Sequence, residues 1–370
     1  MHVNDLVCLD MPLGQAFVDR VRRAWDEGDA VFPLDHRLPR SASDDVLRAV
    51  RPTVIAGTNG ETRVEGDRVE TGDAAVVATS GSTGTPKAVV LTHAAVRASA
   101  EAVHERLAVT AGDGWFACLP PAHVGGLSVV MRSLVTGTPL RTAAAFNVDD
   151  YVAAAREGST LVSLVTTALR RVDPSLFRSI VLGGSRPPAD RPSNCVATYG
   201  MTETGSGVVY DGVPLRGVEI DIRSGIIHIR SAMNMRAYRN SPSPFDADGW
   251  LRTGDIGNWN EDGTLNVQGR EGDLIITGGE NVWPETVESV IAQMEGVRDC
   301  CVAGLPDPEW GQSVHVFIVG DAPPLEAVRD FVKQSLPAHC APKHVHVVGE
   351  IPRTALGKPR RGDLPALIGR

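Results

Sequence analysis

The chain has 370 residues, of which 42% are hydrophobic and 22% charged, and its formal net charge at pH 7 is −9. This length exceeds what one hydrophobic core usually holds, so we expect two domains. The composition is typical of a globular protein and excludes a disordered, collagenous or coiled-coil chain, and the acidic balance argues against a nucleic-acid partner.

No apolar run approaches the ~20 residues that a membrane span needs. The first residues lack the basic and continuous apolar regions of a secretory signal. The six cysteines stand at positions 8, 118, 195, 300, 301 and 340. They form no C-x-x-C pair and no zinc-ligand spacing with histidines. We therefore expect a cytoplasmic protein with reduced cysteines and no stable membrane association.

The first 75 residues are weakly periodic and predict one helix, over 15–27. From residue 74 the sequence changes, because an apolar strand, a polar glycine-rich loop and a second apolar strand are predicted up to residue 92. A helical pattern over 94–107 follows.

Strands and helices alternate beyond this point. Strands are predicted at 160–165, 179–184 and 195–200, with helical stretches such as 149–155 between them. This alternation predicts an α/β fold with mostly parallel sheets, whose functional loops follow the C-termini of the strands.

The pattern turns to short, closely spaced strands after residue 210. V-E-I-D-I-R, G-I-I-H-I-R-S and T-L-N-V-Q-G-R predict an antiparallel or barrel-like subdomain. The last 100 residues predict a separate α+β domain, with helices over 284–294 and 323–336 and strands C-C-V-A-G-L, V-H-V-F-I-V-G and H-V-H-V-V.

A glycine-rich loop, T-S-G-S-T-G-T-P-K at 79–87, is the first segment that predicts chemistry. Small residues and hydroxyls let the backbone turn its amides toward an anion, and Lys87 adds a positive charge. The loop is not a Walker loop, because Pro86 precedes the lysine and the spacing differs. A flexible Ser/Gly turn is the alternative.

Four further segments follow this loop in the order typical of adenylate-forming enzymes. They are Y-G-M-T-E-T at 199–204, W-L-R-T-G-D at 250–255, G-R at 269–270 with G-G-E-N-V-W-P-E at 278–285, and P-R-T-A-L-G-K at 352–358. The chain thus resembles the superfamily of acyl-CoA synthetases, luciferases and peptide-synthetase adenylation domains. The resemblance implies a large adenylating domain over 1–270, with mostly parallel sheets, flanking helices and a small β subdomain. It also implies a mobile α+β domain over 271–370, with a hinge near Gly272.

The resemblance also implies that the protein uses ATP and Mg²⁺, with coenzyme A as a co-substrate. It further implies the roles of individual residues. The residues that it assigns to the nucleotide are Thr79, Ser80, Gly81, Ser82, Thr83, Gly84, Lys87, Gly183, Gly184, Ser185, Tyr199, Gly200, Met201, Asp255 and Arg270. Among them, Asp255 is the expected partner of the ribose hydroxyls, with an Asx turn as the alternative.

Two further residues are expected to handle the phosphates and one to assist bond formation. Thr202 would donate to a phosphate, and the Glu203 carboxylate would hold Mg²⁺. Lys358 would stabilise the negative charge that develops when a carboxylate attacks the α-phosphate. The chain departs from the family pattern at two positions. Relatives usually have glycine at the position of Ala88, and aspartate or lysine at the position of Gly272.

Coenzyme A is expected to bind to the second domain. The resemblance implies that Gly278 and Gly279 border a channel for the pantetheine arm. Lys343 is a candidate contact to the phosphates of coenzyme A, and a solvated surface lysine is the alternative.

The acid substrate is indicated by L-P-P-A-H-V-G-G-L at 119–127, which resembles a segment of acyl- and aryl-CoA ligases and puts His123 beside the acyl pocket. A packed core histidine is the alternative. The aspartate by which amino-acid-activating relatives hold an ammonium is absent. The short chain and V-V-Y-D-G-V-P-L at 208–215 most resemble the o-succinylbenzoate–CoA ligases of actinobacterial menaquinone synthesis.

An aromatic acid with two carboxylates needs a partner for the one that does not react. Arg132 lies in an apolar helix-like run, where an unpaired cation is costly, so it is a candidate for this role. Snorkelling of its side chain to solvent is the alternative. Expected pocket-lining residues are Ser163, Thr166, Ser206 and Gly207.

Two other functions stay open. One keeps the two-step chemistry but uses another aryl or acyl acid, or a carrier-protein thiol. The other is a nucleotide-binding regulator that has lost catalysis, against which the intact Lys358 and Glu203 argue. The lack of a G-x-S-x-G motif argues against a serine hydrolase. Whether the chain forms a homodimer stays open.

Overall fold

The computed structural model describes residues 4–79, 86–184, 187–188, 190–321, 323–353 and 359–368. Two compact units form, the first from residues 1–220, 229–251 and 263–265 and the second from 221–228, 252–262 and 266–370. A domain boundary after residue 270, with a hinge near Gly272, stays a prediction.

The first unit contains a seven-stranded sheet with the order β16-β6-β5-β2-β1-β3-β4. Its strands are β1 (Leu6–Asp10), β2 (Ala30–Pro33), β3 (Val54–Gly57), β4 (Gly60–Arg63), β5 (Asp73–Thr79), β6 (Lys87–Thr92) and β16 (Ala237–Tyr238). The four central strands β5, β2, β1 and β3 run parallel, and antiparallel strands complete both sides. Strands β1 and β2 are almost completely buried, as is usual for parallel strands covered on both faces.

A second seven-stranded sheet has the order β13-β12-β11-β10-β9-β7-β8. Its strands are β7 (Trp115–Ala117), β8 (Leu140–Thr142), β9 (Leu161–Val165), β10 (Ser179–Gly183), β11 (Cys195–Met201), β12 (Ser206–Tyr210) and β13 (Val213–Pro214). All neighbours from β8 to β11 are parallel, whereas β12 and β13 add antiparallel pairs at one end.

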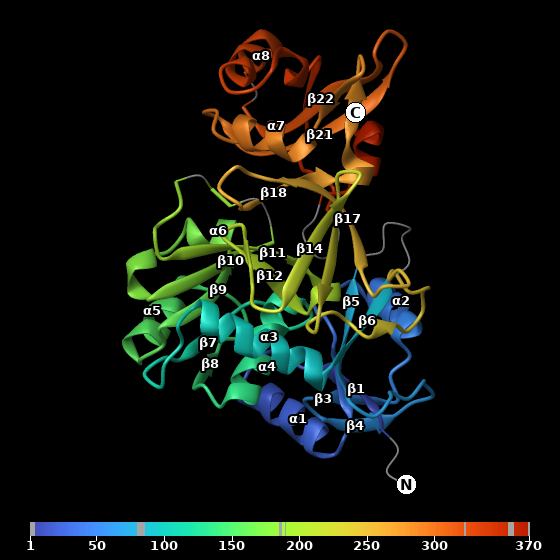
Figure 1. Cartoon of the computed structure of the whole chain (residues 1–370), viewed down its shortest axis with the longest axis vertical. Helices are drawn as coiled ribbons and strands as arrows, with labels where there is room; N and C mark the ends of the chain where they lie inside the picture. The colour runs from blue at the N-terminus through green and yellow to red at the C-terminus, as the bar shows by residue number, and fades with distance from the viewer. Residues whose placement is uncertain are drawn as a thin grey trace. The chain divides into compact units, whose positions relative to one another are not determined.

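Helices connect and cover these strands. They are α1 (Gln15–Asp26), α2 (Arg40–Val50), α3 (His93–Arg106), α4 (Val124–Thr136), α5 (Val148–Arg156) and α6 (Thr166–Leu169). Helices α3 and α4 lie side by side, and α3 contacts strands of both sheets (Figure 1). Thr92 caps α3 by accepting from the Ala95 N–H, and Asn147 caps α5 in the same way, which supplies partners for N–H groups that the first turn leaves unpaired.

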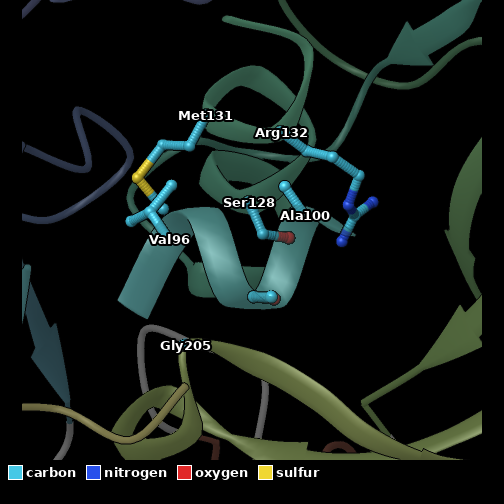
Figure 2. Close-up of a pocket in the computed structure, with 7 residues that line it drawn as sticks. Val96, Ala100, Ser128, Met131, Arg132 and Gly205 are labelled. Carbon is cyan, nitrogen blue, oxygen red and sulfur yellow. The ribbon is translucent and has the colours of Figure 1, made fainter. Parts of the chain in front are cut away.

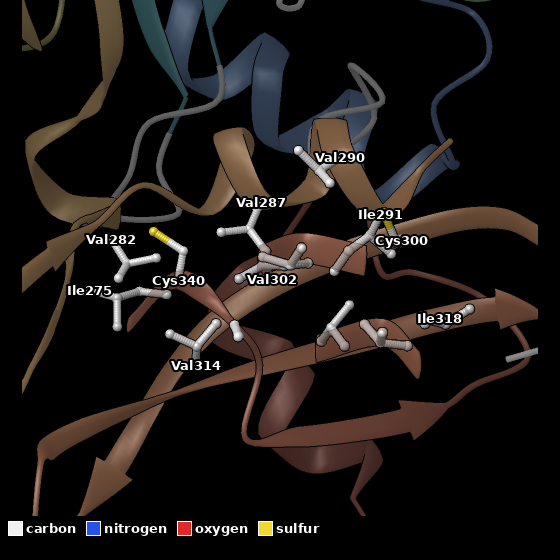
Figure 3. Packing of buried hydrophobic residues seen from close by; sticks show 14 residues of the cluster. Ile275, Val282, Val287, Val290, Ile291, Cys300, Val302, Val314, Ile318 and Cys340 are labelled. Atoms are coloured by element: carbon white, nitrogen blue, oxygen red, sulfur yellow. The ribbon is translucent and has the colours of Figure 1, made fainter. Parts of the chain in front are cut away.

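The second unit contains much of a four-stranded sheet and the whole of a five-stranded sheet. The strands of the former are β14 (Val218–Arg223), β15 (Ile226–Ser231), β17 (Leu251–Trp259) and β18 (Leu265–Arg270). The latter contains β19 (Ile275–Thr277), β20 (Glu280–Val282), β21 (Val297–Asp307), β22 (Gly311–Gly320) and β23 (His344–Val347). Helices α7 (Pro284–Ile291) and α8 (Leu325–Lys333) pack on one face, over a core that includes Val287, Val302 and Val314 (Figure 3).

Five short 3₁₀ helices complete the chain: η1 (Pro174–Leu176), η2 (Thr202–Thr204), η3 (Glu271–Asp273), η4 (Ala338–Cys340) and η5 (Arg361–Leu367). None of the helices in the described ranges combines the length and apolarity that a membrane crossing requires. All six cysteines belong to the described part, are buried, and form no disulfide there.

Three histidines stack where β22 and β23 run parallel. The His315 Nδ1 lies 2.9 Å from the His346 Nε2, and the ring centroids of His315 and His344 are 4.3 Å apart. His315 is 9% exposed, and Ser313 Oγ meets its other ring nitrogen. Burial, followed by the neighbouring His344 and His346, lowers the pKa of His315 to about 4, although Asp307 opposes this.

We expect the stability of the second unit to fall in mild acid because of this cluster. An unfolded histidine titrates near 6.5, so between pH ~6.5 and ~4 the unfolded chain binds more protons and the free energy of unfolding decreases as the pH falls. Urea unfolding at pH 7.5 and pH 5.5 measures this loss, which should be smaller in His315→Gln than in the wild type. The exposed His36→Gln is the matched control. Equal losses in all three proteins would contradict the prediction.

Candidate active site

Functional residues of the first unit gather where parallel strands of the second sheet end. The chain leaves β7 toward His123, β9 toward Thr166, β10 toward Gly184, and β11 toward Thr202 and Glu203. Because the carboxyl ends of parallel strands lie at one edge of a sheet, these segments share that edge.

The turn that carries Thr202 and Glu203 depends on a glycine. At Gly200 a β-carbon would lie 2.2 Å from the Ser206 carbonyl oxygen, so no larger residue fits where β11 and β12 shift register. Thr204 Oγ1 accepts from the Met201 N–H at 2.9 Å and donates to the Ser206 carbonyl at 2.7 Å. These bonds hold the η2 turn, which leaves Thr202 and Glu203 half-buried.

Glu203 and Lys87 meet around one aromatic ring. Tyr238 donates its hydroxyl hydrogen to Glu203 Oε1 at 2.7 Å, and Lys87 Nζ lies 5.0 Å from the centroid of the Tyr238 ring. Lys87 pairs with Thr79 across β5 and β6, so both ends of the glycine-rich loop are placed by this hairpin. The structure thus brings together a carboxylate and an ammonium predicted to serve Mg²⁺ and ATP.

Seven predicted site residues lie outside the described residues. They are Ser80, Gly81, Ser82, Thr83 and Gly84 of the glycine-rich loop, Ser185 after β10, and Lys358 near the C-terminus.

His123 precedes helix α4 and contacts a charged pair that follows β2. The Arg37 Nη2 lies 2.9 Å from His123 Nε2, and Asp35 Oδ2 lies 3.7 Å from the same nitrogen. Arg37 binds Asp35 through two nitrogens, at 2.8 and 2.7 Å. Burial alone would raise the pKa of Asp35, but the hydrogen bonds from Arg37 hold it below its usual range. Since arginine is a permanent donor, His123 Nε2 accepts, which places the ring proton on Nδ1.

Arg132 is buried rather than snorkelling, with 3% of its surface exposed. Its guanidinium carbon lies 4.8 Å from the centroid of the Trp115 ring, and its Nε and Nη1 have no hydrogen-bond partner among the described residues. Burial lowers the pKa of this guanidinium. The side chain helps to line a cavity of about 10 Å³ with Ser128, Met131 and Gly205 (Figure 2).

The other predicted residues of the first unit lie on the same strands. Ser163 is buried in β9, and Thr166 opens α6 directly after that strand. Ser206 and Gly207 begin β12 opposite Met201 and Gly200. Gly183 ends β10 and Tyr199 lies in β11, whose register with β10 puts Leu182 beside Ala197.

Asp255 and Arg270 form an ion pair within the second unit. Arg270 Nε lies 2.9 Å from Asp255 Oδ1, and Asp255 is 7% exposed whereas the arginine side chain is half exposed. The Asp255 N–H donates to Thr253 Oγ1, and Gly254 adopts a φ of 73° between them. This backbone conformation within β17 directs the carboxylate toward Arg270.

Gly278 and Lys343 meet at an exposed tryptophan. A β-carbon at Gly278 would lie 2.5 Å from the Trp310 ring, and the Gly278 N–H donates to the Trp310 carbonyl at 2.9 Å. Lys343 Nζ lies 3.6 Å from the centroid of the same ring, and Gly279 follows with a φ of 84°. The three segments thus form one surface of the second unit.

Sequence reasoning missed the residues that connect the predicted ones. Tyr238, Arg37, Asp35 and Trp310 belong to no motif with a chemical meaning of its own. Tyr238 reaches Lys87 only because Ala237–Tyr238 pairs with β6, which lies about 150 positions earlier in the chain. A single tyrosine in the polar segment M-R-A-Y-R-N gives no signal of such a pairing.

Family comparisons identify the two parts of the chain. The sequence model of the AMP-binding enzyme family matches residues 49–238, and that of the AMP-binding enzyme C-terminal domain matches residues 286–358.

Several relatives align with most of the chain. A protein of Mycobacterium tuberculosis named probable 2-succinylbenzoate–CoA ligase is 39% identical over 355 residues, which cover 87% of this chain and 91% of that protein. The o-succinylbenzoate CoA synthetase (MenE) of Bacillus subtilis, solved in complex with the acyl-adenylate intermediate OSB-AMP, aligns with a TM-score of 0.89 at 26% identity. That alignment covers 98% of this chain and 88% of the other. The same enzyme with ATP and magnesium ion gives a TM-score of 0.87 at 26% identity, over 99% and 90% of the two chains.

Proposed function

The chain belongs to the AMP-binding enzyme family, and on this premise we propose that it activates 2-succinylbenzoate with ATP and joins it to coenzyme A. In the first step a carboxylate oxygen attacks the α-phosphorus of ATP, which forms acyl-AMP and releases pyrophosphate. In the second step the sulfur of coenzyme A attacks the acyl carbon, AMP leaves, and the thiol loses its proton. The observation that carries the proposal is the 39% identity to a ligase of this name across 91% of its length.

The first unit supplies groups suited to the first step. We assign the ATP phosphates to the glycine-rich loop with Lys87, and to Thr202. Glu203 is assigned to Mg²⁺, which lowers the cost of charge on the phosphates when it is bound. In the described ranges no three metal-binding side chains converge, which fits Mg²⁺, since it is usually held by one or two carboxylates together with substrate phosphates. Lys358 is assigned the charge that develops at the α-phosphate, and Asp255 with Arg270 the ribose.

The second unit offers a surface for coenzyme A. Trp310, with Lys343 over its ring and Gly278 packed against it, combines an exposed aromatic face with a positive charge. Such a pair suits a nucleotide with attached phosphates. A homodimer and a cytoplasmic location stay predictions, as does a place in menaquinone synthesis.

The test measures pyrophosphate release from the protein with MgATP and a panel of acids, followed by addition of coenzyme A. Release with 2-succinylbenzoate, and thioester formation only after coenzyme A is added, is the expected result. Release with benzoate or a fatty acid alone would overturn the assigned substrate and favour a ligase for another acid. Bound ATP without release for any acid would overturn catalysis and favour the regulator.

We assign Arg132 to the second carboxylate of the acid. A buried guanidinium with two unpaired nitrogens is costly unless an anion satisfies it, and Ser128 beside it adds a hydroxyl. The cavity of about 10 Å³ holds one water-sized group. A carboxylate would therefore bind through a water, or directly once the flexible Met131 side chain moves aside.

Arg132→Met should raise the KM for 2-succinylbenzoate about 10- to 100-fold, because a hydrogen bond to a charged group contributes about 1.5–3 kcal/mol. Methionine retains an apolar contact to Trp115, and removal of a buried unpaired charge should leave the melting temperature unchanged or higher. The KM for ATP should not change. Arg20→Met is the control and should affect stability only, because it breaks the ion pair between the buried Arg20 of helix α1 and Glu61 of strand β4. An unchanged KM for the acid would remove Arg132 from the pocket.

A further inference from the structure

A short segment after residue 234 extends the first sheet beside the glycine-rich loop. Strand β16 pairs antiparallel with β6, with Tyr238 opposite Val89. Backbone bonds continue this pairing on both sides, from the Arg236 N–H to Val90 and from the Arg239 N–H to Ala88. We name residues 235–240 the strap. It runs along the strand that begins at Lys87, so its side chains lie next to the exit of the loop.

Tyr238 touches both groups that the proposed function assigns to MgATP. Its hydroxyl donates to Glu203 Oε1 at 2.7 Å, and its ring lies under Lys87 Nζ. A hydrogen bond to a carboxylate is charge-assisted, and it fixes which carboxylate oxygen faces the ring. The bond uses Oε1 and leaves Oε2 as the oxygen for another partner.

Asn240 brackets Lys87 from the other end of the strap. Its Nδ2 donates to the Pro86 carbonyl at 2.8 Å, and its Oδ1 accepts from the Ala88 N–H at 3.1 Å. The two residues that flank Lys87 are thus held by one side chain. This contact fixes the backbone from which the lysine extends.

Hydrogen bonds hold the strap against the rest of the first unit. It can therefore position both Glu203 and Lys87. Arg236 binds the buried Asp73 through two nitrogens, at 2.9 and 3.0 Å. The Arg239 guanidinium donates to carbonyls of Val50, Arg68 and Asp67. In addition, the Met235 N–H donates to the Glu203 carbonyl at 2.7 Å, which ties the backbone of Glu203 to the same segment.

We propose that Tyr238 and Asn240 are positioning residues for adenylation, which set the distance between the magnesium carboxylate Glu203 and the phosphate-binding Lys87. The proposal rests on the function proposed above. Tyr238 orients the carboxylate for the metal, and Asn240 orients the exit of the loop for the phosphates. The two residues therefore affect different ligands, which makes the proposal testable.

Tyr238→Phe keeps the ring beneath Lys87 and removes only the hydroxyl. Loss of a partner that orients a metal ligand typically weakens metal affinity 10- to 100-fold. We expect the Mg²⁺ concentration for half-maximal pyrophosphate release to rise about tenfold or more, with an unchanged KM for 2-succinylbenzoate. Tyr151→Phe is the matched control, since Tyr151 of helix α5 loses a hydroxyl that donates to the Asp173 carbonyl at 3.1 Å.

Asn240→Ala should instead raise the KM for ATP severalfold at saturating Mg²⁺ and leave the half-maximal Mg²⁺ concentration near the wild-type value. Its control is Asn194→Ala, because Asn194 also bridges backbone groups, the carbonyls of Pro174 and Phe177 at 2.8 Å each. Thermal melts of all four variants separate these effects from a loss of folding.

A double variant separates positioning from a general structural role. In the Glu203→Gln background, Tyr238→Phe should change the Mg²⁺ dependence less than twofold, because the carboxylate that it orients is gone. A shift of the same size in both backgrounds would overturn the proposal, as would a Tyr238→Phe protein that matches Tyr151→Phe. If the wild type itself releases no pyrophosphate with Mg²⁺, the proposed function fails, and the proposal for Tyr238 and Asn240 fails with it.

Discussion

Glu203→Gln is expected to reduce the rate of pyrophosphate release at saturating ATP by about 10²–10³, the usual loss when a charged group that stabilises a transition state is removed. The substitution isolates the charge, because the amide oxygen of glutamine can still accept from the Tyr238 hydroxyl. The position of the side chain is thus retained, whereas an oxygen ligand with full negative charge is lost. Single-turnover release of pyrophosphate at several Mg²⁺ concentrations measures the effect.

Glu219→Gln is the matched control for this substitution. Glu219 is an exposed carboxylate that accepts from the Arg230 guanidinium at 2.6 Å, so the same change of charge occurs at a residue that no motif assigns to a ligand. The control should retain wild-type activity and Mg²⁺ dependence. A Glu203→Gln enzyme with more than a tenth of the wild-type rate would show that another group holds the metal.

The fold could be predicted from the sequence where the periodic patterns of apolar residues extend over many residues. The predicted helix over 15–27 is observed as α1, the helix over 94–107 as α3, and the three central strands as β9, β10 and β11. The α/β class with mostly parallel sheets and a smaller α+β part is confirmed. Helices α7 and α8 are shorter than predicted, ending at Ile291 and Lys333, because the apolar pattern continues into turns that pack on the same core.

The first 75 residues show what periodicity cannot detect. Four strands and helix α2 form there, although only one helix was predicted. Strands β1 and β2 have five and four residues, too short to show a period. Apart from the exposed Asp10 at the end of β1, all their residues are apolar and buried. Their identity is set by pairing with one another and with β3 and β5, which are distant in sequence.

The site divides in the same way. Motif residues such as Glu203, in the η2 turn after β11, and Asp255, within β17, could be named because each belongs to a short contiguous motif. The partners of these residues could not, since Tyr238 and Arg37 are single residues brought in by strand pairing and by the connection after β2. Residues predicted to contact the ligand belong to short local motifs, whereas the residues that contact and orient them come from distant parts of the chain.

Asp255→Asn is expected to raise the KM for ATP about 10²-fold while the KM for 2-succinylbenzoate stays near the wild-type value. A carboxylate that accepts from two ribose hydroxyls contributes about 1.5–3 kcal/mol for each bond, and an amide has only one acceptor oxygen for both. The loss of charge also weakens the pairing with Arg270, which in addition donates to the Thr253 carbonyl at 3.4 Å. Initial rates of pyrophosphate release at varied ATP measure the change.

Asp221→Asn tests whether this effect belongs to the ribose. Asp221 is a half-exposed aspartate that binds the Arg223 Nε at 2.7 Å, so the control removes an Asp–Arg pair of similar geometry in the same unit. It should leave the KM for ATP unchanged. A further comparison uses 2′-deoxy-ATP, for which the wild type already lacks one hydroxyl. If Asp255 holds the ribose, Asp255→Asn should discriminate less between ATP and 2′-deoxy-ATP than the wild type does. Equal discrimination in both proteins would assign Asp255 a structural role in β17 and not a contact to the nucleotide.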